Sequence, residues 1–187
     1  LMYTKPATTY NTELNELYEK NIFSVMEEVW ASDDERIDLV IFLNGLAIMS
    51  FELKCNFAGQ SVEDAIYQYR MDRNPKTRLF LFKAGTLVNF AMDLNEVYMT
   101  TKLTGEDTFF LPFNRGKGEG IEAGKGNPII ESEEYPVEYM WKDILKKDTI
   151  IELLFKYIFI EVEEKKDEKT GKTTIKESII FPRYHQI

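Results

Sequence analysis

Two apolar segments separated by the dipeptide Asn44-Gly45 form the clearest pattern along the chain. Residues 37–43 and 46–54 are rich in β-branched and other apolar side chains, and neither segment alternates strictly between apolar and polar positions. Because Asn-Gly is a preferred two-residue hairpin turn, the pattern predicts a β-hairpin whose strands are buried on both faces. We therefore expect this hairpin at the centre of a sheet.

A helix is predicted after the hairpin. Ser61 can act as its N-cap, and Asp64 stands three residues later, at the second position of a capping box. The helix is expected to span residues 62 to about 73, because Asn74-Pro75 disfavours its continuation. Three further strands are predicted at residues 79–83, 87–92 and 97–103.

The N-terminal region leaves two alternatives open. Asn11 or Thr12 can cap a helix that carries an apolar stripe. Either this stripe continues as far as Trp30, or the helix ends at Asn21 and residues 22–30 are extended. Periodicity alone does not decide between them.

The composition and the pattern of apolar residues change after residue 103. This second part holds a Gly-rich stretch, two helical patterns and a charged excursion, at residues 116–126, 139–147, 150–159 and 161–178. We therefore divide the chain into a core over residues 1–103 and a mostly helical extension over residues 104–187. The expected fold class is α/β, with a mixed central sheet flanked by helices.

The composition narrows the chemistry. The chain has 187 residues, 44% of them apolar, which suffices for one domain with its own core. It contains one cysteine, Cys55, and one histidine, His185, so it cannot build a Cys/His zinc site alone. A Ser-His-Asp triad is also disfavoured, because the single histidine lies close to the end of the sequence. One cysteine and the lack of a long apolar run favour a cytoplasmic protein without membrane contact.

The distribution of charge leaves room for a nucleic-acid partner. The formal net charge of −9 argues against strong unaided binding of nucleic acid. One local segment is nevertheless basic, and Asp72 is the single acidic residue within it. Its side chains either contact DNA phosphates or form a solvated face that needs no ligand. They are Arg70, Arg73, Lys76, Arg78 and Lys83.

Three ionisable residues interrupt the apolar hairpin in the pattern D-x13-E-x-K. Glu52 and Lys54 are two apart on one strand and so share a face, while Asp38 lies on the neighbouring strand. Two carboxylates suit a hard cation such as Mg²⁺ or Mn²⁺, and a nearby lysine can stabilise charge that develops on a phosphate. The alternative is an exposed Glu52–Lys54 ion pair of small energetic value. Burial favours the metal site, because an ionised group in a central strand is costly unless it is paired or bound.

The register of the hairpin decides whether a shared site can exist. A regular two-residue turn pairs Asp38 with Phe51, which puts Asp38 and Glu52 on opposite faces. A three-residue loop with Gly45 in the left-handed region pairs Asp38 with Ser50 and brings both carboxylates to one face. We therefore predict this loop, or an equivalent change of register.

Several short motifs of the sequence resemble those of a known family. Asp38, Glu52-Leu53-Lys54 and then Gln68 on the next helix resemble the PD-(D/E)xK nuclease superfamily. Longer stretches resemble the endonuclease domain of the restriction (R) subunit of type I restriction-modification enzymes. These are Arg36–Val40, Asn44–Leu46, Phe51–Lys54, Gln68–Arg70, Leu79–Phe80, Tyr98–Thr101, Phe110–Asn114, Gly126–Pro128 and Phe181–Gln186. The resemblance covers roughly residue 10 to the end.

The resemblance implies an αβββαβ core that cleaves double-stranded DNA with Mg²⁺, or Mn²⁺ in its place, through a metal-activated water. Asp38 and Glu52 match the metal ligands, Lys54 the catalytic lysine and Gln68 the glutamine of a Q-x-x-x-Y motif. The sequence departs from this motif at Asp72, which stands where tyrosine is expected.

The resemblance also implies partners. These are the methylation (M) and specificity (S) subunits, and ATP is used only by a motor domain expected downstream of this chain, in which we find no complete P-loop. The alternative function is a catalytically idle module that docks DNA or these subunits.

Overall fold

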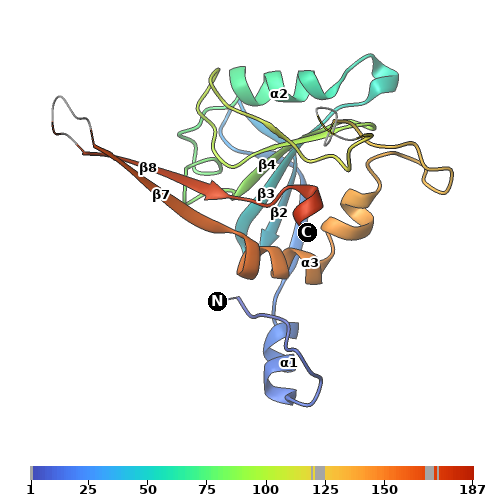
Figure 1. Ribbon diagram of the computed structural model, residues 1–187, viewed down its shortest axis with the longest axis vertical. Coiled ribbons are helices and arrows are strands. Elements are labelled where there is room, and N and C mark those ends of the chain that lie inside the picture. The colour runs from blue at the N-terminus through green and yellow to red at the C-terminus, as the bar shows by residue number, and fades with distance from the viewer. Residues whose placement is uncertain (1, 119, 121–124, 167–170, 172) are drawn as a thin grey trace.

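Six strands form one mixed sheet at the centre of the protein (Figure 1). The computed structural model describes residues 2–118, 120, 125–166, 171 and 173–187. The strands follow one another across the sheet in chain order, and only the β3–β4 pair is parallel. Their bounds are β1 (Phe23–Trp30), β2 (Arg36–Leu43), β3 (Leu46–Leu53), β4 (Val88–Met92), β5 (Val97–Thr100) and β6 (Leu111–Pro112). The α/β class and the mixed sheet are confirmed.

The N-terminal helix ends early, which settles the two alternatives for this region. Helix α1 (Thr12–Glu19) begins after Asn11, whose side chain accepts a hydrogen bond of 3.0 Å from the Leu14 N–H. The following residues are extended as β1, which forms one edge of the sheet. In Figure 1, α1 lies away from the sheet, near the N terminus.

Helix α2 (Val62–Met71) covers one face of the sheet (Figure 1). The Ser61 N–H donates a hydrogen bond of 2.8 Å to Asp64 Oδ2, so the predicted capping box is present. The short 3₁₀ turn η1 (Asn56–Ala58) connects β3 to this helix. The order of elements from α1 to β4 is thus α-β-β-β-α-β. The core beneath α2 contains Ile37, Val40, Val62, Ala65, Tyr69, Phe80, Ala91, Leu103 and Phe110.

The other face of the sheet is covered by helical turns from the C-terminal part of the chain. These are η3 (Met140–Ile144), α3 (Lys147–Glu152) and η4 (Leu153–Tyr157), with η5 (Tyr184–Gln186) near the chain end. Buried residues such as Tyr139, Ile150 and Leu153 share one core cluster with Phe51 and Phe90 of the sheet. Both predicted segments, 1–103 and 104–187, therefore contribute to the same core.

The prediction of a strand at residues 79–83 is wrong, since these residues form turns. The backbone folds back on itself, because the Thr86 N–H donates to the Leu79 carbonyl at 2.8 Å and the Gly85 N–H donates to the Leu81 carbonyl at 2.7 Å. A Cβ atom added at Gly85 would lie 2.1 Å from the Leu79 carbonyl oxygen. Residues 79–83 therefore form a turn, although their apolar side chains are typical of a strand.

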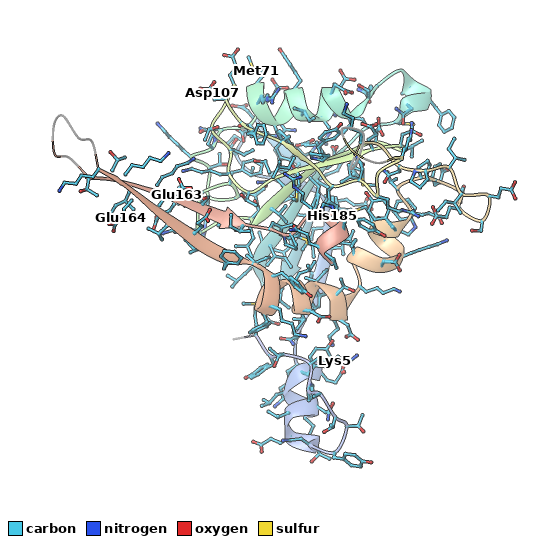
Figure 2. All side chains as sticks on the ribbon, viewed as in Figure 1. Lys5, Met71, Asp107, Glu163, Glu164 and His185 are labelled. Atoms are coloured by element: carbon cyan, nitrogen blue, oxygen red, sulfur yellow. The ribbon has the colours of Figure 1, made fainter. Side chains whose placement is uncertain are left out.

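The prediction of a mostly helical extension is also wrong for the second half of residues 104–187. Strands β7 (Phe159–Lys166) and β8 (Thr173–Ile180) form a separate two-stranded antiparallel sheet where a charged excursion was predicted. Figures 1 and 2 show this hairpin projecting from the body of the protein, with Glu163 and Glu164 on its arm. Both faces of β7 are exposed, so charged side chains are tolerated along it. Lys169, Thr170 and Lys172, and residues 119 and 121–124 of the Gly-rich stretch, lie outside the described residues.

The helices of the described part of the chain are short. None of them has both the length and the apolar character that a membrane-spanning helix requires.

Candidate active site

The β2–β3 hairpin contains a two-residue turn and a bulge. Asn44 and Gly45 have φ values of 51° and 82°, as a turn of the type favoured by Asn-Gly requires. One residue of β3, Ile48, has no partner on β2, because Phe42 pairs with its predecessor and Ile41 pairs with its successor. The predicted three-residue loop is therefore wrong, but the predicted change of register is confirmed at another position.

The bulge places Asp38 and Glu52 on the same face of the sheet. Beyond the bulge Leu39 pairs with Phe51, so Asp38 lies opposite Glu52 on the neighbouring strand. We expected Ser50 as the partner of Asp38 and a diagonal arrangement of the two carboxylates. The register of the last pair, extended by one residue, opposes them directly, and directly opposed cross-strand side chains approach most closely.

A backbone hydrogen bond holds Asp38 in the site. The Leu53 N–H donates to Asp38 Oδ2 at 2.7 Å, which joins the two strands at the end of their pairing. The Asp38 side chain is half-buried. Its Oδ2 is thus engaged by the protein, and Oδ1 is the oxygen through which it could bind a ligand.

Glu52 is fully buried and pairs with an arginine through one of its two oxygens. The Arg73 Nε–H donates to Glu52 Oε1 at 2.7 Å, while Oε2 has no hydrogen-bond partner among the described residues. Burial raises the pKa of Glu52 to about 7, although the ion pair with Arg73 acts in the opposite direction. The negative charge of Asp38 raises this pKa further, and Lys54 lowers it. Burial therefore outweighs the two nearby cations in its effect on the pKa of Glu52.

Lys54 and Gln68 form the other half of the site. The Lys54 Nζ donates a hydrogen bond of 2.5 Å to Gln68 Oε1, and both side chains are half-buried. Because Lys54 follows Glu52 by two residues, it projects from the same face, and α2 brings Gln68 onto that face. The structure thus brings together the four predicted catalytic residues.

The tyrosine next to Gln68 is part of the core. Tyr69 is fully buried, and its hydroxyl lies 2.8 Å from Ser50 Oγ. Ser50 Oγ in turn donates to Asn89 Oδ1 at 2.7 Å, so the hydroxyls belong to a buried polar network beneath the site. Asp72, at the position where the motif has tyrosine, is the exposed C-cap of α2.

The basic segment is divided between the interior and the surface. Lys76 and Arg78 are exposed, whereas Lys83 pairs with Glu177 of the projecting hairpin at 2.5 Å. The Nε–H of Arg70 donates to the Thr108 carbonyl at 2.9 Å.

Arg73 requires a correction, because only 7% of it is exposed and its guanidinium lies inside the protein. It is a partner of Glu52 in this structure and not a surface phosphate contact. Sequence reasoning missed this role, although a carboxylate in a central strand signals a need for a nearby cation.

The carboxylates fit a divalent cation in number and chemistry. Among the described residues, no cluster of three or more His, Cys, Asp or Glu side chains could hold a metal. Mg²⁺, however, is commonly held by one or two carboxylates together with water and substrate phosphate. Asp38 and Glu52 each keep one oxygen outside their contacts with the protein, and Glu52 Oε2 is buried without a partner.

The histidine lies elsewhere. His185 lines a pocket with Asp143, Ile144 and Thr149, on the face of the sheet opposite α2. It belongs to η5, and Figure 2 shows it away from Met71 at the end of α2. It is therefore not part of the carboxylate site.

Comparison with protein families supports the sequence resemblance. The family model described as the type I restriction enzyme R protein N terminus matches residues 11–108, which is more than half of the chain. The chain belongs to this R protein N-terminal family. The matched region begins at the N-cap of α1 and includes Asp38, Glu52, Lys54 and Gln68. Searches among curated proteins and among solved structures found no match.

Proposed function

We propose that this chain is a PD-(D/E)xK nuclease domain of a type I restriction enzyme R protein, which cleaves double-stranded DNA with the help of Mg²⁺. One observation carries the proposal: Asp38 and Glu52 directly flank the last pair of β2 and β3, Leu39 and Phe51, and so project from one face of the sheet. Membership of the R protein N-terminal family supports a role in a restriction system.

Asp38 and Glu52 would hold the cation, through Asp38 Oδ1 and Glu52 Oε2. When bound, Mg²⁺ supplies Lewis acidity, which polarises the scissile phosphate and favours ionisation of water; Mn²⁺ offers the same chemistry. The protein contributes a rigid pair of ligands, since both carboxylates project from adjacent strands and each is anchored by one hydrogen bond.

Lys54 would stabilise negative charge that develops on the phosphate during attack. Its ammonium group is held by Gln68 at 2.5 Å, so its position is fixed before DNA binds. Such preorganised electrostatic contacts are typically worth about 10²–10³ in rate. Gln68 acts on the reaction through Lys54.

DNA would approach across the exposed basic side chains that follow α2. Lys76 and Arg78 are exposed, and Arg70 lies on the same helix as Gln68, so all three are proposed phosphate contacts. The net charge of −9 argues against strong unaided binding of DNA, and we propose that the M and S subunits help to hold it. ATP would be used by another part of the R protein, and the complex would act in the cytoplasm.

The test uses the full-length R protein assembled with its M and S subunits. Wild-type complex, with Mg²⁺ and ATP, is expected to cut unmethylated plasmid DNA that carries its recognition sites. Asp38→Ala is expected to abolish cleavage while ATP hydrolysis continues, because only the nuclease site is altered. Undiminished cleavage by Asp38→Ala would instead assign the chain to the docking of DNA or subunits.

A further inference from the structure

One guanidinium group connects the two strands that carry the carboxylates. The Arg73 Nε–H donates to Glu52 Oε1 on β3 at 2.7 Å. The Nη2–H of the same side chain donates to the Arg36 carbonyl on β2 at 3.0 Å. Arg36 lies two residues before Asp38 on β2, so Arg73 contacts β3 at one carboxylate and β2 close to the other.

This arrangement differs from a simple structural ion pair in the same protein. Arg115 pairs with Glu133 through two hydrogen bonds, of 3.0 and 2.6 Å, which engage both carboxylate oxygens. Arg115 also donates to the Pro136 carbonyl at 3.2 Å, so the two arginines differ in how they hold the carboxylate: Arg73 engages only one oxygen of Glu52. Within the part of the chain that the structure describes, Glu52 Oε2 remains buried without a hydrogen-bond partner as a result.

The planar guanidinium suits this task. Its N–H groups have fixed relative directions, so contact with the Arg36 carbonyl restricts where the Nε–H can meet Glu52. The side chain is also buried, with 5% of its surface exposed, so direct contact with a DNA phosphate would require rearrangement of the site.

We propose that Arg73 is a positioning residue of the nuclease site, which holds Glu52 by Oε1 and thereby keeps Oε2 available for the divalent cation. This inference rests on the proposed nuclease function. Arg73 acts through Glu52 and does not touch the DNA or the reacting phosphate. Its contact with β2 fixes Glu52 relative to the strand that carries Asp38.

The test measures Mn²⁺ binding to the 187-residue chain by electron paramagnetic resonance, which needs no DNA and no partner subunit. The variants are Arg73→Gln, Arg73→Lys and Asp38→Ala. Arg115→Gln is the matched control, because it breaks another Arg–Glu pair that lies outside the site. Circular dichroism establishes that each variant is folded at the temperature of the measurement.

Arg73→Gln is expected to raise the Mn²⁺ dissociation constant roughly tenfold or more, as loss of a residue that orients a ligand usually does. Arg73→Lys keeps the charge but lacks the planar fork, so it is expected to restore only part of the affinity. If Arg73→Gln does not fold, the same measurement on Arg73→Lys decides, with weaker binding than wild type expected. Arg115→Gln is expected to bind like wild type.

Two results would overturn the positioning role. One is wild-type affinity in both Arg73 variants while Asp38→Ala abolishes binding, which would leave the metal site intact and Arg73 purely structural. The other is an equal loss in Arg115→Gln, which would show a general effect of lowered stability. Failure of the wild-type chain to bind Mn²⁺ would instead count against the proposed nuclease site itself, and the role of Arg73 would fall with it.

Discussion

The backbone N–H of Leu53 donates a 2.7 Å hydrogen bond to Oδ2 of Asp38. This bond links β3 to β2 beyond their last paired residues, so Asp38 has a structural role beside its proposed role as a metal ligand. The two roles can be separated, because an asparagine oxygen can accept the same hydrogen bond without carrying a charge.

Asp38→Asn is expected to lose Mn²⁺ binding while its free energy of unfolding stays within about 0.5 kcal/mol of wild type. Asp38→Ala is expected to lose both metal binding and the hydrogen bond, at a cost of about 1–2 kcal/mol. Metal titration and urea denaturation of the two variants check this difference. Equal destabilisation by both substitutions would show that the Leu53 contact contributes nothing.

Lys54→Ala is expected to reduce DNA cleavage by the assembled complex by about 10²–10³, because the lysine acts on charge that develops during the reaction. Mn²⁺ affinity is expected to change little, since Lys54 is not a metal ligand. Single-turnover cleavage measures the rate, and ATP hydrolysis controls for assembly. A complex that hydrolyses ATP and cuts DNA at the wild-type rate would reject the role of Lys54.

Gln68→Ala is expected to slow cleavage less than Lys54→Ala, by roughly tenfold, because it frees the lysine without removing it. The double variant is expected to be no slower than Lys54→Ala alone, since the two residues act as one unit. A double-mutant cycle on the cleavage rate checks this coupling. Additive losses would mean that Gln68 acts independently of its 2.5 Å contact with Lys54.

The stability of the metal-free protein is expected to depend on the ionisation of Glu52. Its pKa is raised from 4.5 to about 7 by burial, so the folded protein binds more protons than the unfolded chain between these values. The stabilising contribution is therefore complete below pH 4.5 and is lost as the pH rises through 7, with an upper bound of about 3 kcal/mol. Denaturation in EDTA, compared between wild type and Glu52→Gln, measures it. A difference that does not vary over this pH range would contradict the assignment.

Well above pH 7, where Glu52 is ionised, Arg73→Met is expected to lower the free energy of unfolding by about 3–5 kcal/mol, because it leaves a buried carboxylate without its cation. Glu52→Gln combined with Arg73→Met is expected to recover much of this loss, since no buried charge then remains. Thermal and urea denaturation of the three variants give the interaction energy. A double variant less stable than Arg73→Met alone would show that the pair is not coupled in this way.

Local sequence signals predicted the part of the fold that carries the site. Asn44-Gly45 identified the hairpin, and Ser61 with Asp64 identified the start of α2, because both depend on neighbouring residues only. The position of the bulge at Ile48 could not be predicted in the same way. It depends on which faces of β2 and β3 pack against α2 and α3, and that is a property of the whole sheet.

The predictions that were wrong concern residues whose local sequence pattern is compatible with two structures. Residues 79–83 are apolar enough for a strand, but the close approach of Gly85 to Leu79 makes them a turn. β7 and β8 have no buried face along most of their length, so their charged residues suggested an irregular excursion. Arg73 was assigned to the surface by its charge, and its burial depends on Glu52, which lies 21 positions away in the chain.

The two-residue turn of the β2–β3 hairpin also bears on the order in which the chain folds. Hairpins with short turns form within microseconds, so β2 and β3 can meet before α2 docks on the sheet. At that stage Asp38 and Glu52 would oppose each other as like charges without Arg73, and this repulsion disfavours their pairing. We therefore expect the hairpin and α2 to form one cooperative folding unit, whose backbone amides exchange with deuterium at a common free energy of opening. Because Asp38 and Glu52 repel each other, stable pairing of β2 with β3 depends on the later contact of Arg73 with Glu52.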